Sequence, residues 1–222
     1  TQPLYERAVE ATESSRASSL ALAKHCAPAS PRAVHLLIAS ERVEDTSEAL
    51  RRALRDVLSD PRPATHRNAA AQYLRLRIPD AAADHLSRAI AYDSRDAASY
   101  ELRARVSRDW GLPADALGDA YRAVYFAPFS ASAQNTLGTI LYRLGHRAEA
   151  LARYHASLAR DPAAAYALNN LCALALDTAD PYRATVTCRA ALALDPTLAP
   201  AQRNLATAEA LLTDEGASNE RH

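Results

Sequence analysis

The sequence predicts an all-α protein in which short pairs of helices stack on one another as an α-solenoid. Three observations support this prediction. Ala makes up roughly a quarter of the 222 residues, aromatic residues make up only 6%, and apolar patterns recur at a 34-residue spacing. Ala is the best helix former and lets helices approach closely. A recurring helical pair that is too small to bury its apolar face alone is typical of a solenoid.

The clearest unit covers residues 131–164. Leucines follow a helical spacing over 137–144, and a second amphipathic pattern covers 151–158. Gly145 separates the two patterns at a point where a helix can end in a left-handed residue at little cost. Pro162 cannot continue the second helix, because it lacks an N–H and its ring clashes with the preceding turn. The segment is therefore expected to form an αα-hairpin.

The same pattern recurs in four consecutive segments, 63–96, 97–130, 131–164 and 165–198, which we interpret as repeats. The columns that recur are Ala82, Ala116, Ala150 and Ala184; Ala89, Ala123, Ser157 and Ala191; Ile90, Val124, Leu158 and Leu192; Ser94, Pro128, Pro162 and Pro196; Ala70, Ala104, Gly138, Cys172 and Ala206; and Leu137, Leu171 and Leu205. So many matched columns indicate an internal repeat.

The ends of the chain are less regular. Residues 1–62 are expected to be helical, with one or two degenerate hairpins that end near Pro28 and Pro61. Residues 199–212 are expected to form a capping helix, which a solenoid needs to cover its last apolar face. Residues 213–222 have no periodicity and are expected to be disordered.

These columns resemble the tetratricopeptide repeat (TPR), a 34-residue helix–turn–helix family. The resemblance is strongest over 131–198, where Leu-Gly, Ala and Asp-Pro recur in order. Over 63–130 it is weaker, because Arg103 replaces an apolar Leu and Ser94 replaces Pro. The resemblance implies a right-handed superhelix whose first helices line a concave face, and no catalytic activity or cofactor.

In this family the concave face binds extended peptides or partner helices, so the resemblance implies a groove for a protein partner. The implied lining residues are Arg67, Asn68, Glu101, Arg105, Arg108, Asn135, Thr139, Tyr142, Arg143, Asn169, Asn170, Arg203 and Asn204.

Asparagines recur within this set, in two adjacent columns. An amide offers both a donor and an acceptor, so a row of Asn can pair with a peptide backbone of any sequence. The arginines can add bidentate contacts to carboxylates. The alternative is that the Asn side chains bond only to neighbouring helices and that the arginines are solubilising. The pattern that grips carboxylate termini in one family subtype needs lysines, and these are missing here.

Two further groups of residues stay open to more than one interpretation. The aromatic residues Tyr121, Tyr125, Phe126 and Phe129 can pack between repeats or form an exposed docking patch. Cys172 and Cys188 are expected on the two helices of one hairpin, either as a buried thiol pair or as a disulfide. An oxidised pair would favour an exported protein.

Several classes of function find no support in the sequence. The net charge is zero, which argues against nucleic-acid binding through a basic field, although a local arginine face stays open. No apolar run is long enough for a membrane span. The seven histidines are scattered, without metal-ligand spacing, and no nucleophile or phosphate-loop motif is present. No metal site, cofactor or catalytic residue is expected.

The chain begins at Thr1 and contains no Met, which predicts a processed or trimmed product. Loss of an initiator Met and cleavage of an export signal both fit, so cytoplasmic and exported locations both stay open. The first functional hypothesis is a non-catalytic scaffold that binds a protein segment in the groove. The alternatives are a structural subunit that self-assembles into an oligomer or filament, or one component of a larger envelope or secretion complex.

Overall fold

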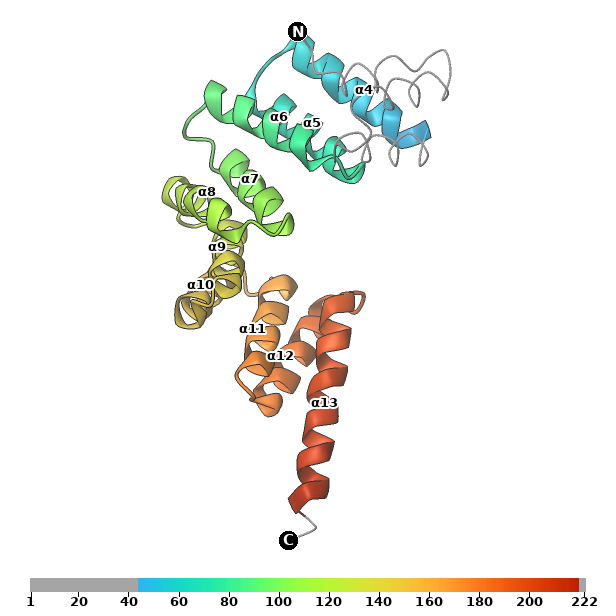
Figure 1. Ribbon diagram of the computed structural model, residues 1–222, viewed down its shortest axis with the longest axis vertical. Coiled ribbons are helices and arrows are strands. Elements are labelled where there is room, and N and C mark those ends of the chain that lie inside the picture. The colour runs from blue at the N-terminus through green and yellow to red at the C-terminus, as the bar shows by residue number, and fades with distance from the viewer. Residues whose placement is uncertain (1–43, 220–222) are drawn as a thin grey trace. The chain divides into compact units, whose positions relative to one another are not determined.

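The computed structural model describes residues 44–219, and this part of the chain consists of ten helices joined by short turns (Figure 1). The all-α prediction is confirmed. The part of the expected N-terminal hairpins that precedes residue 44 lies outside the described residues. The helices are α4 (Glu44–Ser59), α5 (Pro63–Arg75), α6 (Pro79–Tyr92), α7 (Ala97–Asp109), α8 (Pro113–Phe126), α9 (Ala131–Arg143), α10 (Arg147–Arg160), α11 (Ala165–Asp177), α12 (Pro181–Leu194) and α13 (Ala199–Asn219).

The chain divides into two compact units, the first ending at Val106 and the second beginning at Ser107. In the first unit, α4 packs against α5 and α5 packs against α6. Their shared core contains the fully buried side chains of Leu50, Tyr73, Ile78 and Leu86. Burying a large apolar side chain stabilises the fold by about 1.5–3 kcal/mol. One hairpin without neighbours could not bury all of these side chains.

In the second unit every helix from α9 to α12 packs against the helix that follows it. In addition, α11 contacts both α9 and α13, so the first helices of successive hairpins also touch one another. The core around α11, α12 and α13 is made mostly of small residues, among them Ala175, Ala184, Ala191 and Ala201. Small side chains let these helices approach closely, which is the packing that the Ala-rich composition predicted.

The first helix of each hairpin ends in the same turn, with one residue in the left-handed region. These residues are Arg77 (φ 61°), Gly111 (φ 79°), Gly145 (φ 85°) and Ala179 (φ 55°). After α9, the Gly145 N–H donates to the Tyr142 carbonyl (3.0 Å) and the His146 N–H donates to the Leu141 carbonyl (2.9 Å). These two bonds define a Schellman motif, which satisfies carbonyls that the helix end leaves unpaired.

The turn between hairpins is also repeated. Asp93, Asp161 and Asp195 each follow a second helix, and each Oδ1 accepts the backbone N–H of the residue two positions later at 2.9–3.0 Å. An Asp side chain that bonds its own backbone in this way favours a turn. The turn that joins one hairpin to the next therefore has the same hydrogen bond at these three positions.

Helices α9 and α10 approach closely at Gly138. A Cβ atom at this position would lie 2.8 Å from Cε1 and 2.9 Å from Cδ1 of Tyr154, closer than packed side chains allow. Tyr154 is only 1% exposed, so its ring cannot move aside into solvent. Gly138 is the member of the small-residue column that has no side chain at all.

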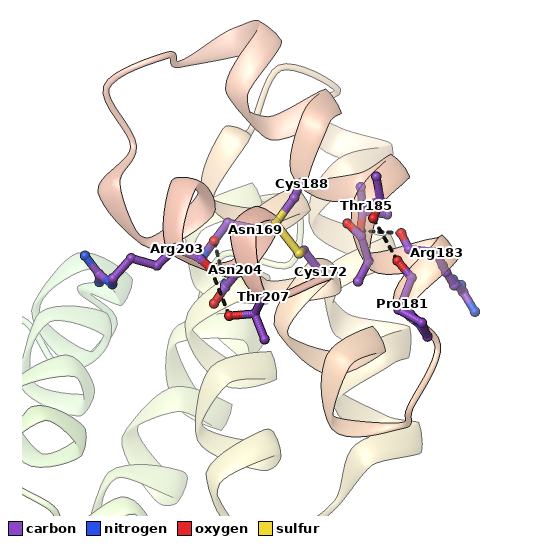
Figure 2. Close-up of a disulfide and its surroundings, with 11 residues drawn as sticks. Asn169, Cys172, Pro181, Arg183, Thr185, Cys188, Arg203, Asn204 and Thr207 are labelled. Carbon is purple, nitrogen blue, oxygen red and sulfur yellow. Dashed lines mark hydrogen bonds between the residues drawn. A yellow bond between two sulfur atoms is a disulfide. The ribbon is translucent and has the colours of Figure 1, made fainter. Parts of the chain in front are cut away.

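One repeat later, the two positions equivalent to Gly138 and Tyr154 are Cys172 and Cys188. Both are fully buried, and they form a disulfide between α11 and α12 with Cα atoms 5.3 Å apart (Figure 2). The structure therefore joins the two cysteines, where the sequence left a buried thiol pair and a disulfide as alternatives. The covalent bond replaces the contact that an aromatic ring makes with glycine in the preceding hairpin.

The last helix differs from the expectation. We expected a capping helix over 199–212 and a disordered tail from 213, but α13 continues to Asn219. No Pro interrupts 213–219, and the single Gly216 lowers helix stability by only about 1 kcal/mol. The expected end at residue 212 is therefore wrong. Residues 220–222 lie outside the described residues.

The left-handed turns predict opposite effects for exchanging Gly and Ala at two equivalent positions. Replacing Gly145→Ala should lower the free energy of unfolding by about 1 kcal/mol, because a Cβ is disfavoured at positive φ. Replacing Ala179→Gly should raise it by up to about 1 kcal/mol for the same reason. Urea unfolding followed by circular dichroism measures both changes.

The control for this pair is Ala152→Gly, in the exposed middle of α10. In a helical conformation Gly destabilises by about 1 kcal/mol, so this variant should lose stability. If Ala179→Gly lost as much stability as Ala152→Gly, the left-handed turn would not be the feature that governs residue 179.

The disulfide predicts that the second unit depends on oxidation. Reduction should lower its free energy of unfolding by about 3 kcal/mol, the chain-entropy value for closing a loop of about 15 residues. Urea unfolding with and without a phosphine reductant measures the difference. The double variant Cys172→Ala, Cys188→Ala should unfold at the same urea concentration in both conditions. An identical midpoint for the oxidised and reduced wild-type chain would contradict the prediction.

Candidate partner-binding site

Four asparagines on the first helices of the second unit form side-chain hydrogen bonds from one repeat to the next. Asn170 Nδ2 on α11 donates to Asn135 Oδ1 on α9 at 2.8 Å. Asn204 Nδ2 on α13 donates to Asn169 Oδ1 on α11 at 3.1 Å (Figure 2). All four side chains are half-buried. We call these residues the asparagine ladder.

The ladder uses only half of its hydrogen-bonding groups. Within the described part of the chain, Nδ2 of Asn135 and Asn169 and Oδ1 of Asn170 and Asn204 make no further hydrogen bond. Each amide offers one pair of donors and one acceptor. The bonds between repeats therefore orient the amides and leave donors and acceptors for another molecule.

A polar cluster on α9 extends the ladder. Asn170 Nδ2 also lies 3.3 Å from Thr139 Oγ1, which donates to the Asn135 carbonyl at 2.9 Å. Burial raises the pKa of Tyr154 to about 12, and a hydrogen bond with Thr139 opposes that rise. The Tyr154 side chain is thus a neutral hydroxyl that contacts Thr139.

Tyr142, on the same helix, lies beside an ion pair. Burial raises the pKa of Tyr142 above its ordinary value, and the Asp177 carboxylate raises it further, while Arg147 opposes both. Arg147 Nε bonds to Asp177 Oδ2, and this contact lowers the pKa of the Asp177 carboxyl. The tyrosine hydroxyl therefore stays protonated near neutral pH and can donate or accept a hydrogen bond.

Two arginines of the expected groove contact each other through the backbone. Arg143 Nη1 donates to the carbonyl of Arg108 at 2.6 Å. Arg108 Nε in turn pairs with Asp109 at 2.8 Å. Arg203, on α13, is exposed. Within the described residues, the guanidinium of Arg203 makes no hydrogen bond or ion pair, unlike those of Arg108 and Arg143.

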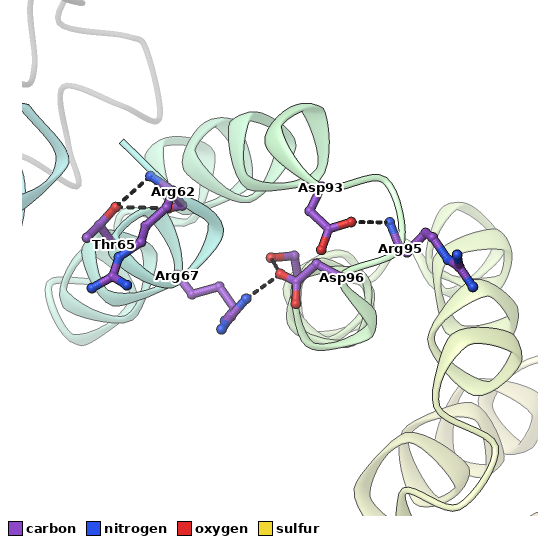
Figure 3. A network of polar contacts seen from close by, with 7 residues as sticks. Arg62, Thr65, Arg67, Asp93, Arg95 and Asp96 are labelled. Atoms are coloured by element: carbon purple, nitrogen blue, oxygen red, sulfur yellow. Dashed lines mark hydrogen bonds and ion pairs between the residues drawn. The ribbon is translucent and has the colours of Figure 1, made fainter. Parts of the chain in front are cut away.

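The expected groove residues of the first unit are arranged differently. Arg67 pairs with Asp96, which also accepts the hydroxyl of Ser99 (Figure 3). Asn68 is exposed and accepts a local bond from Gln72 at 3.3 Å. In this unit the ion pair within the chain takes the place of the asparagine contacts between repeats.

The remaining two candidates of the first unit are Glu101 and Arg105, both on α7. Arg105 is exposed and Glu101 is half-buried. The structure thus brings together Asn135, Thr139 and Asn170 in the second unit, with Tyr142 further along the same helix α9. The other candidates, Arg67, Asn68, Glu101 and Arg105, belong to the first unit.

Sequence reasoning missed the pair of Arg147 and Asp177, because the two residues are 30 positions apart and the period of 34 does not relate them. It also missed the buried pair of His66 and His85 in the first unit, whose Nδ1 atoms lie 3.0 Å apart. Tyr92 stacks on His66 and Tyr73 stacks on His85. The period of 34 does not relate residues 66 and 85, which lie on opposite helices of one hairpin, so only packing reveals their contact.

None of the four aromatic residues of this cluster is fully buried, and Tyr121 is 41% exposed. Tyr125 is 78% exposed and Phe129 is 71% exposed, whereas Phe126 is half-buried and packs edge-on against Tyr125. The guanidinium of Arg160 lies 4.5 Å from the centre of the Phe129 ring. Core packing between repeats, one of the two interpretations of this cluster, does not describe Tyr125 and Phe129, because both rings are mostly exposed.

The described residues contain no group of three or more His, Cys, Asp or Glu side chains that could hold a metal ion. Over the same residues, no helix combines the length and the apolar character that crossing a membrane requires.

Comparison with known proteins finds similarity at the level of structure. No family model matches the chain, and no curated protein matches it. The structure of TTC0263, a thermophilic TPR protein of Thermus thermophilus, superposes with a TM-score of 0.64 at 20% identity, covering 73% of this chain and 90% of that chain.

Two further solved structures extend the coverage. YrrB, described as a TPR protein with an unusual peptide-binding site, gives a TM-score of 0.55 at 18% identity, covering 90% of this chain and 96% of that chain. A chain of the APC/C hetero-tetramer Cut9-Hcn1 gives 0.71 at 19% identity, covering 93% of this chain and 42% of that chain. Together with the helical pairs described above, these likenesses show that the chain has the tetratricopeptide-repeat fold, as its 34-residue columns predicted.

Proposed function

We propose that this chain is a non-catalytic scaffold that binds an extended protein segment along α9, α11 and α13 of its second unit. The observation that carries the proposal is the asparagine ladder. Its amides are held in place by bonds between repeats, and each keeps groups for a ligand. The fold itself is one that generally supports protein–protein interaction rather than catalysis.

The chemistry of the ladder suits the backbone of a peptide. A peptide in an extended conformation presents N–H and C=O groups along its length, which donors on Asn135 and Asn169 and acceptors on Asn170 and Asn204 can pair. Each such bond contributes about 0.5–1.5 kcal/mol. Because the amides are already oriented, little further side-chain entropy is lost on binding.

Charge around the ladder favours an acidic segment. Arg143 and Arg203 are exposed on α9 and α13, the helices that flank the asparagines of α11. An arginine binds a carboxylate with two parallel hydrogen bonds. The solved structure of YrrB, which has the same fold, is described as having a peptide-binding site, and this likeness supports the same class of ligand here.

The proposal predicts that peptides selected on the full chain depend on the ladder. Peptides taken from a displayed library should bind the triple variant Asn135→Ala, Asn169→Ala, Asn204→Ala at least tenfold more weakly, a loss of about 1.4 kcal/mol. Isothermal titration calorimetry measures the affinity, and circular dichroism checks that the variant is folded.

A second variant separates binding from folding. Asn135→Asp keeps the Oδ1 that accepts from Asn170 but removes the Nδ2 donor that we assign to the ligand. It should leave thermal stability nearly unchanged and still weaken peptide binding. If the selected peptides bound both variants as tightly as the wild type, the ladder would not be the binding site.

Self-association is a second candidate, favoured by one observation. Tyr125 and Phe129 expose large aromatic surfaces at the end of α8 and in the turn that follows it, and exposed apolar patches often mark protein contacts. A second copy of the chain could cover them. The arginine above Phe129 covers one ring only.

Light scattering over a concentration series tests this candidate. Self-association through the patch predicts a mass that rises with concentration, and a monomer at all concentrations for the double variant Tyr125→Ser, Phe129→Ser. A wild-type chain that stays monomeric throughout would reject this candidate and leave the peptide scaffold in place.

A further inference from the structure

A pocket of about 270 Å³ lies among α10, α11 and α12, within the second unit. Its apolar lining is formed by Ala148, Leu151, Leu171, Leu174 and Ala175. Pockets for drug-sized ligands usually measure about 300–1,000 Å³, so this cavity fits a smaller group. Its apolar lining suits a branched aliphatic side chain.

Two arginines line the same pocket, and their surroundings differ. Arg147, the first residue of α10, pairs with the Asp177 carboxylate. Arg183 is exposed on the first turn of α12, where its backbone N–H donates to Asp180 Oδ1 at 2.9 Å. Within residues 44–219 the structure shows no hydrogen bond or ion pair of the Arg183 guanidinium. Arg183 is therefore the cation that a bound anion can pair with.

We propose that this pocket binds the C-terminal residue of a partner protein, with an aliphatic side chain in the cavity and the α-carboxylate on Arg183. Charge complementarity identifies the anion, since the available charged group on the lining is a guanidinium, which pairs carboxylates with two hydrogen bonds. The five apolar lining residues identify the side chain. The complete ligand is thus an apolar group and a carboxylate within one small cavity.

The directions of side chains in an extended segment distinguish a chain end from two adjacent residues within a segment. In an extended segment, successive side chains point to opposite sides. An internal Leu-Asp pair would therefore place only one of its two side chains in the pocket. A C-terminal leucine, isoleucine or valine carries the aliphatic group and the carboxylate on one Cα atom, so both can enter together.

The pocket and the asparagine ladder use different residues of α11. The pocket takes Leu171, Leu174 and Ala175, and the ladder takes Asn169 and Asn170. The second unit thus offers one site for the middle of a segment and another for a chain end. Because no residue is shared, loss of one site by substitution leaves the other intact, and the two proposals can fail separately.

Small probes test the site on the full chain by two-dimensional NMR. N-acetyl-L-leucine should bind with a Kd on the order of 1–10 mM, the range expected for so few atoms, and shift the methyl signals of Leu171 and Leu174. N-acetyl-L-leucinamide lacks the carboxylate and should bind at least fivefold more weakly. N-acetylglycine lacks the aliphatic group and should give no saturable shift.

Two matched variants complete the experiment. Arg183→Gln should weaken N-acetyl-L-leucine at least fivefold and leave N-acetyl-L-leucinamide unchanged. Arg189→Gln, also exposed on α12 but not part of the lining, should bind the acid like the wild type. An internal probe, N-acetyl-Leu-Asp-amide, should bind at least fivefold more weakly than N-acetyl-L-leucine.

Three results would overturn the proposal. The first is equal binding of the acid and the amide, which would remove the role of the carboxylate. The second is an unchanged affinity for the acid in Arg183→Gln. The third is tighter or equal binding of the internal probe, which would assign the pocket to the middle of a segment.

Discussion

The close approach of two helices at the same position of two successive hairpins sets the geometry of the second unit. At Gly138 the absence of a Cβ lets the Tyr154 ring lie against the backbone of α9. At the equivalent position in the next hairpin, the disulfide between Cys172 and Cys188 holds α11 and α12 at the same level. In these two hairpins the distance between the paired helices is therefore limited by a contact at glycine or by a covalent bond.

Polar side chains also meet across repeats, where first helices of successive hairpins lie against each other. Successive first helices touch, as α11 does with α9 and α13, so side chains that are 35 positions apart can bond directly. Asn135 and Asn170 do so, and Asn169 and Asn204 do so one repeat later. The bonds that stabilise the stack and the groups that we assign to a ligand belong to the same amides, so neither interpretation of the asparagines excludes the other.

The first unit is built on the same turns but carries different polar chemistry. It keeps the left-handed residue at Arg77, although an Arg is disfavoured there. In place of an asparagine ladder it has the ion pair of Arg67 with Asp96 and the buried contact of His66 with His85. Because Arg67 is already paired with a carboxylate, this unit offers less to a ligand at that position than the second unit does.

The spacing of residues along the chain predicted the helical pairs and their repeat, whereas the packing of whole helices established which side chains meet. The 34-residue columns and the stops at Gly145 and Pro162 are local features, and local propensity decides where helices begin and end. A local stop was misjudged at the end of α13, where no residue forbids the helix to continue. The partners of Asn170 and Asn204, the contact of Arg147 with Asp177, and the pocket beside Arg183 join residues whose separations are not multiples of the period. Such contacts depend on how far one helix is displaced along its neighbour and on which way each side chain turns. A repeat in the sequence does not contain that information, because packing between whole helices sets it.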